Sequence, residues 1–148
     1  MAERKLVAMR RVAAVRTAQR AVAERALGVA TGAVVESRDA LARAGEQVDL
    51  AFATWRALVD AVCFQPEIQR YHAAQLIART GEADAARADC DRAGETLTAA
   101  RQALHCADAA LERSGMIVRR LARRERMQRE ERQLADHADR VTQRWGRR

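Results

Sequence analysis

The sequence predicts an all-α protein, a long antiparallel two-helix coiled-coil hairpin with an overhanging C-terminal helix that forms a single domain over residues 1–148. Three observations lead to this fold class. The 148 residues include only two Trp, two Phe and one Tyr, too few large side chains for a globular core, while Ala, Val, Leu, Arg and acidic residues dominate as in long helices. Apolar residues recur in a 4-3 pattern along most of the chain. A single proline, Pro66, divides this pattern into two parts.

The first predicted arm covers about residues 3–62. A 4-3 template selects eighteen positions in it, fifteen of them apolar, and its register does not slip. The positions are Ala2, Leu6, Met9, Ala13, Arg16, Arg20, Ala23, Leu27, Ala30, Val34, Ser37, Leu41, Ala44, Val48, Ala51, Trp55, Leu58 and Val62. An apolar seam of this length is typical of a coiled coil.

The predicted turn covers about residues 63–66. A proline is tolerated in the first turn of a helix, but inside a helix it costs about 3 kcal/mol and disfavours helical geometry at the residue before it, Gln65. We therefore expect a new helix to begin at Pro66 or Glu67. Because a short connection makes consecutive helices antiparallel neighbours, the chain is expected to fold back here, with arms about 90 Å long.

The second predicted arm covers about residues 67–145. The same template selects sixteen positions in it, twelve of them apolar, namely Gln69, His72, Leu76, Arg79, Ala83, Ala86, Cys90, Ala93, Leu97, Ala100, Leu104, Ala107, Leu111, Ser114, Val118 and Leu121. Thr80 and Gly81 offer the strongest rival break, which would give a three-helix bundle. Because the stripe keeps its phase across them, a continuous helix is favoured.

The end of the second arm is expected to extend past the start of the first. If the turn centres near residues 64 and 65, Ala2 lies opposite about Met127, so residues 127–148 have no partner arm. The seam is expected to rotate here, because the earlier register would select Glu125, Gln128 and Arg132, whereas the apolar residues are Met127, Leu134, Ala138, Val141 and Trp145. A helix of about 20 residues is marginal alone, so we expect it to bind a partner with Trp145 as an anchor. The alternative is a frayed, solvated end.

Charge is distributed unevenly along the chain. Residues 1–25 carry seven basic and two acidic side chains, residues 119–148 carry eleven and five, and residues 26–118 carry nine and thirteen. Folding the hairpin would bring the two basic segments together at one end. Such a difference in charge between the ends favours docking on a partner in one direction. The alternative is a solvated surface in an Arg-rich protein.

The sequence lacks the patterns of an enzyme or a metalloprotein. It contains no phosphate-binding glycine loop, dinucleotide fingerprint, zinc-protease motif or nucleophile elbow, and its histidines and its three cysteines stand apart, at positions His72, His105, His137, Cys63, Cys90 and Cys106. We expect no catalysis, metal, cofactor or small-molecule substrate. The odd number of cysteines predicts a reducing compartment. The charged N-terminal segment predicts a cytoplasmic protein without a signal peptide.

An Arg-rich hairpin with basic termini and a longer second helix that ends in RRLARRERMQREERQLADHADRVTQRW resembles the central-stalk proteins of type III secretion and flagellar export ATPases, the FliJ/YscO-like group. The resemblance concerns architecture and rests on no diagnostic motif. It implies a non-enzymatic stalk whose joined termini bind a hexameric secretion ATPase and whose remainder reaches the export gate protein at the inner membrane. Some members of the group also bind export chaperones.

The resemblance and the charge pattern together predict a partner-binding surface at the joined termini. Its expected members are Arg4, Lys5, Arg10, Arg11, Arg119, Arg120, Arg123, Arg124, Arg126 and Trp145. Two other functions stay open. A coiled-coil adaptor or an export-chaperone-binding scaffold would have the same architecture. A basic hairpin that binds nucleic acid through phosphates is less favoured, because the Arg residues alternate with acidic ones and lack interleaved aromatic residues.

Overall fold

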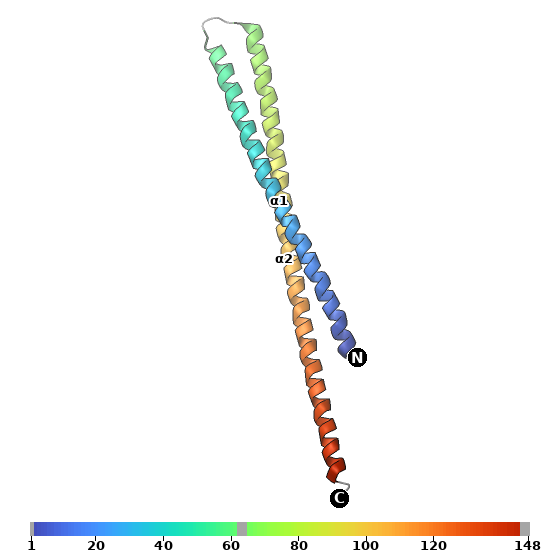
Figure 1. The fold of residues 1–148 in the computed structure, drawn as a ribbon. Helices are drawn as coiled ribbons and strands as arrows, with labels where there is room; N and C mark the ends of the chain where they lie inside the picture. The colour runs from blue at the N-terminus through green and yellow to red at the C-terminus, as the bar shows by residue number, and fades with distance from the viewer. Residues whose placement is uncertain (1, 62–64, 146–148) are drawn as a thin grey trace. The chain divides into compact units, whose positions relative to one another are not determined.

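The chain forms two long helices. A computed structural model describes residues 2–61 and 65–145, in which α1 spans Ala2–Val59 and α2 spans Pro66–Trp145 (Figure 1). These described residues contain no β-strand. The all-helical fold class predicted from the composition and the apolar periodicity is therefore confirmed at this level.

The helices end and begin close to the proline. α1 ends at Val59, and its last turn is extended by a hydrogen bond from the Asp60 backbone N–H to the Arg56 carbonyl, 3.0 Å. α2 begins at Pro66, and the Gln69 backbone N–H donates to the Gln65 carbonyl, 3.1 Å. Pro66 thus occupies the first helical position, where its missing N–H leaves no hydrogen bond unmade. Residues 62–64, which include part of the predicted turn, lie outside the described residues.

A side chain from α2 also reaches the end of α1. The Gln69 Nε2 group donates to the Leu58 carbonyl at 3.3 Å. Leu58 belongs to the last turn of α1, whose carbonyls have no partner within the helix. This hydrogen bond therefore caps α1 and fixes the first turn of α2 beside it.

α2 continues without a break through Thr80 and Gly81. The Thr80 hydroxyl donates to the Leu76 carbonyl at 2.8 Å, and no described glycine has a positive φ angle. The rival three-helix arrangement is therefore not formed. Gly81 is an ordinary interior helical residue, and no atom outside its own neighbourhood lies within 4 Å of the position where a Cβ would stand.

The two helices contribute to two compact units, which we describe separately. The terminal unit comprises residues 1–23 and 104–148, and the central unit comprises residues 24–103. Each unit therefore combines a segment of α1 with a segment of α2.

In the central unit, the predicted seam is the packed face. Ala30 and Val34 are the buried apolar residues of its described part, each with 5% of its surface exposed. The other described seam positions of this unit, from Leu27 to Leu58 on α1 and from Gln69 to Ala100 on α2, are half-buried. The small Ala side chains that dominate this seam bury little area each, so the packing energy is spread over many positions.

In the terminal unit, the seam is less regular. Leu6 is the one buried apolar residue of its described part, and Ser114 is buried opposite the α1 segment. The Ser114 hydroxyl donates to carbonyls of its own helix, those of Ala110 at 3.1 Å and Leu111 at 2.8 Å. Arg16, although it falls on the template, is exposed.

The expected rotation of the seam before Met127 is wrong. Glu125, the position that the unrotated template selects after Leu121, is buried, with 9% of its surface exposed. Every described residue from Arg126 to Trp145 is exposed. The seam therefore keeps its 4-3 register as far as the charged residue Glu125, and it ends there.

Candidate functional site

All ten predicted partner-binding residues belong to the terminal unit, and all ten are exposed. Arg4, Lys5, Arg10 and Arg11 lie in the first turns of α1, and the remaining six lie on α2, at Arg119, Arg120, Arg123, Arg124, Arg126 and Trp145. Trp145 is the most exposed large apolar residue described, with 77% of its surface accessible.

The segments of the terminal unit are joined by a direct ion pair. The Arg20 Nε atom donates to the Asp108 Oδ1 atom at 2.7 Å, and both side chains are about half exposed. An exposed pair of this kind contributes at most about 1 kcal/mol. The pair therefore favours one alignment of α1 against α2, but it adds little to the free energy of their packing.

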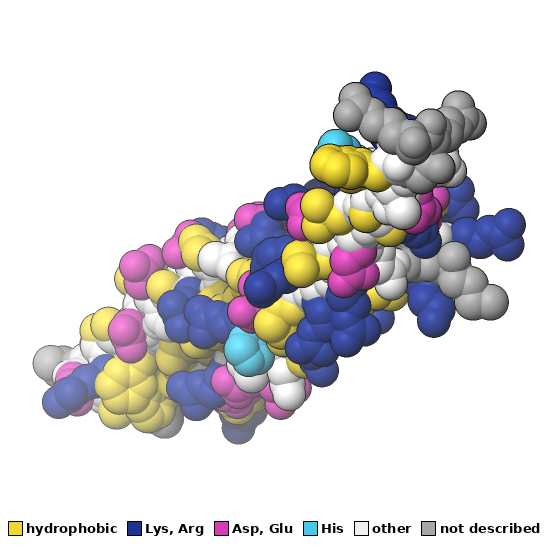
Figure 2. Space-filling view, turned by 90° about the horizontal axis from the view of Figure 1, so that it is seen from below, with side chains coloured by type: hydrophobic (Ala, Val, Ile, Leu, Met, Phe, Trp, Pro, Cys, Tyr) yellow, Lys and Arg dark blue, Asp and Glu magenta, His cyan; other side chains and the backbone are white. Residues whose placement is uncertain are grey.

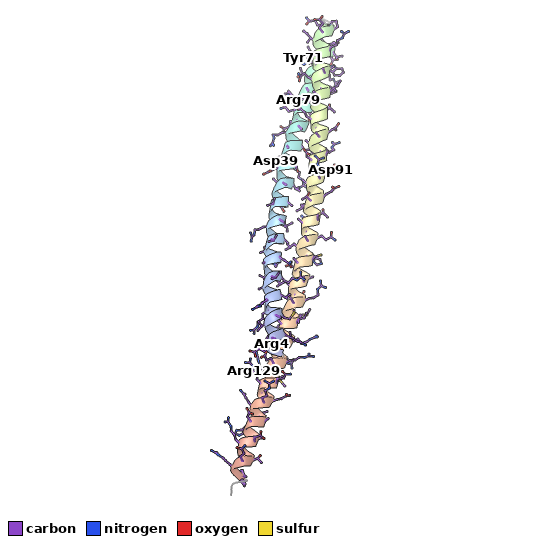
Figure 3. The ribbon with its side chains drawn as sticks, turned by 90° about the vertical axis from the view of Figure 1, so that its right-hand side faces the viewer. Arg4, Asp39, Tyr71, Arg79, Asp91 and Arg129 are labelled. Atoms are coloured by element: carbon purple, nitrogen blue, oxygen red, sulfur yellow. The ribbon has the colours of Figure 1, made fainter. Side chains whose placement is uncertain are left out.

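Nearer the start of α1, both helices line one open cleft. Its lining residues are Glu3, Leu6, Val7, Arg10, Ala122, Glu125, Arg126 and Arg129. The cleft brings together Arg10 and Arg126, which are far apart in sequence. Figure 3 shows Arg4 and Arg129 at neighbouring levels of the terminal unit. The structure thus unites basic residues from both helices, as the sequence predicted for a hairpin.

Glu125 is the buried charge at the centre of this cleft. Its Oε1 atom accepts a hydrogen bond from the Arg129 Nη2 atom at 2.9 Å. Its Oε2 atom is buried and has no hydrogen-bond partner. A buried acceptor without a donor is costly, so Glu125 is expected to weaken the packing beside the first turns of α1.

Sequence reasoning missed Glu125 and Arg129 as members of the site. The available signal was the 4-3 template, which selects position 125 when it is extended past Leu121. Because Glu125 is charged, residue type alone indicates that the seam rotates before this position. A seam position next to Leu6 was the better interpretation.

The other predicted basic residues of α2 lie along grooves of that helix, whereas Arg4, Lys5 and Arg11 lie on α1 and line neither these grooves nor the cleft. One groove is lined by Arg119, Ala122, Arg123, Arg126 and Met127, and another by Arg120, Arg123, Arg124, Met127, Gln128 and Glu131. In the face seen in Figure 2, basic side chains alternate with hydrophobic and acidic ones. The surface is therefore a mixed one with an excess of positive charge.

Trp145 is not gathered with the basic residues. It lies at the last described residue of α2, after the exposed segment that begins at Met127. The apolar residues of this segment are strongly accessible, with Leu134 exposed to 70%. We call residues 127–145 the C-terminal segment. It therefore carries an apolar stripe of its own, separate from the cleft that Arg10 and Arg126 line.

The described residues hold no group of three or more His, Cys, Asp or Glu side chains placed to bind a metal ion. Cys90 is half-buried and Cys106 exposed, each as a free thiol. Neither described helix contains a stretch long and apolar enough to cross a membrane.

No protein-family model, curated protein or solved structure matches the chain.

Proposed function

We propose that the chain is a long antiparallel two-helix coiled-coil hairpin with an overhanging C-terminal helix, and that it acts as the non-enzymatic central stalk of a type III secretion system. In this proposal the basic termini bind the hexameric export ATPase, and the remainder of the hairpin links it to the export gate protein. The stalk works in the cytoplasm, peripheral to the inner membrane.

Contacts within each unit support the hairpin. In the terminal unit, Leu6 shares a cleft with Glu125, and Arg20 pairs with Asp108. Later residues of α1 thus lie beside earlier residues of α2, as in an antiparallel pair of helices. In the central unit, Gln69 reaches Leu58, as expected for two helices that meet at a turn.

The observation that carries the stalk proposal is the cleft that joins both basic segments. Arg10 and Arg126 line it from opposite helices, with Arg129 beside them. Three basic side chains line the cleft against two acidic ones, Glu3 and Glu125, and an excess of positive charge at a helical end orients docking on an acidic surface. Immediately next to it, the C-terminal segment exposes an apolar stripe that ends in Trp145, the residue type most enriched in binding hot spots. Charge and an apolar anchor together suit insertion into a protein ring.

A coiled-coil adaptor or export-chaperone-binding scaffold is the second candidate. It is favoured by the large apolar side chains that both units expose, such as Val29 and Ile77 in the central unit, at 75% and 74%. Such side chains suit additional helical partners. Nucleic-acid binding is less favoured, because acidic residues such as Glu130 and Glu131 interrupt the basic surface.

The decisive experiment is a nuclease-treated affinity purification from the native cell, with co-purifying proteins identified by mass spectrometry. The full-length chain is compared with a truncation that ends at Gln128. A hexameric ATPase that appears with the full chain and is lost with the truncation would support the stalk and place its anchor in the C-terminal segment. Unrelated partners without an ATPase in either sample would favour the adaptor, and recovered nucleic acid would revive the third candidate.

Charge-reversal variants test the basic cleft itself. The double variant Arg10→Glu with Arg126→Glu should lose the ATPase. The matched control, Arg43→Glu with Arg87→Glu, makes the same change of charge on exposed residues of the central unit and should retain it. Equal loss in both variants would show that net charge alone matters, and retention in both would remove the cleft from the proposal.

A further inference from the structure

The α1 segment of the terminal unit has an apolar face that α2 does not cover. Val12, Val15 and Val22 are exposed to 41%, 56% and 62%, and Ala8 and Ala18 are exposed as well. Between Val12 and Val22 the charged residues are Arg16 and Arg20, which fall on the template of the seam that faces α2. A helix that is apolar on two faces is typically covered on both.

The exposed face has its own coiled-coil spacing. Ala8, Val12, Val15, Gln19 and Val22 follow one another in a 4-3 pattern. In the C-terminal segment, Leu134, Ala138, Val141 and Trp145 follow the same alternation, 4-3-4. The terminal unit therefore exposes two stripes of matching period, and neither has a partner within the unit.

We propose that two copies of the chain form a dimer in which the α1 stripe of each copy packs against the C-terminal stripe of the other copy. In this dimer the C-terminal segment of one copy packs on the outer face of α1 in its partner. The terminal unit of the partner, together with this segment, then forms a three-helix bundle. The second copy makes the same contact in return. We define this outer face as Ala8, Val12, Val15 and Gln19. The proposal does not rest on the stalk function, and the two compete, because the dimer covers the C-terminal segment that the stalk would offer to the ATPase.

The geometry of the terminal unit permits the exchange. Glu125, Arg126 and Arg129 lie level with Glu3 and Leu6, because they line one cleft. The C-terminal segment therefore begins where α1 begins. When a second copy is turned end for end, its C-terminal segment runs parallel to α1 of the first copy, over about 28 Å. A two-fold axis repeats the contact, as in most homodimers.

One register satisfies both the apolar stripes and the charges. A parallel alignment that sets Val141 beside Val15 and Trp145 beside Gln19 also sets Leu134 beside Ala8 and Ala138 beside Val12, and in these last two pairs a large side chain meets a small one. In the same register Glu130 and Glu131 come level with Arg4 and Lys5. Opposite charges that flank an apolar seam determine the partner and orientation of a coiled coil.

Charge also argues against pairing two outer faces with each other. The described part of α1 in the terminal unit carries six basic side chains, Arg4, Lys5, Arg10, Arg11, Arg16 and Arg20, against one acidic side chain, Glu3. Two such segments side by side would repel. The C-terminal segment instead is balanced, with Arg129, Arg132, Arg140 and Arg144 against Glu130, Glu131, Asp136 and Asp139. It is therefore the better electrostatic partner for α1.

The test is made on the purified full-length chain without any other protein. Light scattering after size-exclusion chromatography should give twice the chain mass of 16.5 kDa. Val15→Glu and Leu134→Glu should each reduce the mass to one chain. The control variants Val35→Glu and Leu50→Glu, on central-unit residues of similar exposure, 55% and 63%, should remain dimeric.

Cross-linking identifies the contacting faces. In a background with Cys63, Cys90 and Cys106 replaced by Ser and helicity verified, Val15→Cys chains are mixed with differently tagged Val141→Cys chains and oxidised. A mixed disulfide supports the exchange. A disulfide between two Val15→Cys chains alone, or a monomer at every concentration, would overturn it. Because no cellular partner is present, either result leaves the stalk proposal to be tested by the affinity purification.

Discussion

Replacing Glu125 by Leu should stabilise the terminal unit. The wild-type carboxylate is buried on the seam beside Leu6, and its Oε2 atom has no donor. Removing an unsatisfied buried acceptor recovers about 1–3 kcal/mol, and burying a Leu side chain contributes about 1.5–3 kcal/mol. The lost hydrogen bond from Arg129 involves a largely exposed guanidinium group, so it subtracts little. After incomplete packing in an open cleft is allowed for, we expect a net gain of about 2 kcal/mol.

Urea denaturation followed by circular dichroism measures this gain. Glu112→Leu is the matched control, because it makes the same change on an exposed position of α2 in the same unit, where substitutions usually alter stability by less than about 0.5 kcal/mol. Both variants are measured at two protein concentrations, since a new Leu could promote association. A midpoint for Glu125→Leu at or below that of wild type would show that position 125 is not a packed seam position.

Three further predictions concern stability. Gly81→Ala should stabilise the chain by about 1 kcal/mol in urea denaturation, because a Cβ there meets no atom within 4 Å; destabilisation would indicate an unseen close contact. Gln69→Ala should cost about 1 kcal/mol by removing the cap on the Leu58 carbonyl, and should speed amide exchange at the end of α1, whereas unchanged exchange would argue against the cap. A double-mutant cycle of Arg20→Ala and Asp108→Ala should give a coupling below about 1 kcal/mol that decreases in 1 M salt, and a larger, salt-independent value would contradict an exposed pair.

The sequence predicted the packed faces well because helical periodicity is a local property. Both apolar stripes were assigned from spacing alone, and their described members are half-buried or buried, with Arg16 as the exception. The guanidinium group of Arg16 turns along its own helix to donate to the Gln19 Oε1 atom at 2.9 Å. A long side chain can leave a seam by changing its rotamer, and a template based on residue type does not report that choice.

The content of the site was less predictable. That basic residues of both helices would line one cleft followed from the fold-back predicted near Pro66. That Glu125 would be buried among them did not follow, because the cost of a buried carboxylate depends on neighbours contributed by α1. The alignment of α1 against α2 likewise decides which Arg residues line the cleft. Arg10 and Arg126 both line it, whereas Arg120 and Arg124 line a groove of α2.

The exposure of residues 127–145 has a consequence for how this segment recognises any partner. Without tertiary contacts, a helix of this length exchanges with coil in water, so binding must select the helical fraction of the population. The apparent affinity is then reduced in proportion to that fraction. Substitutions such as Gln143→Ala, chosen to raise helix propensity on the side away from the apolar stripe, should tighten binding without adding any contact. The strength of recognition can therefore be adjusted through backbone order alone.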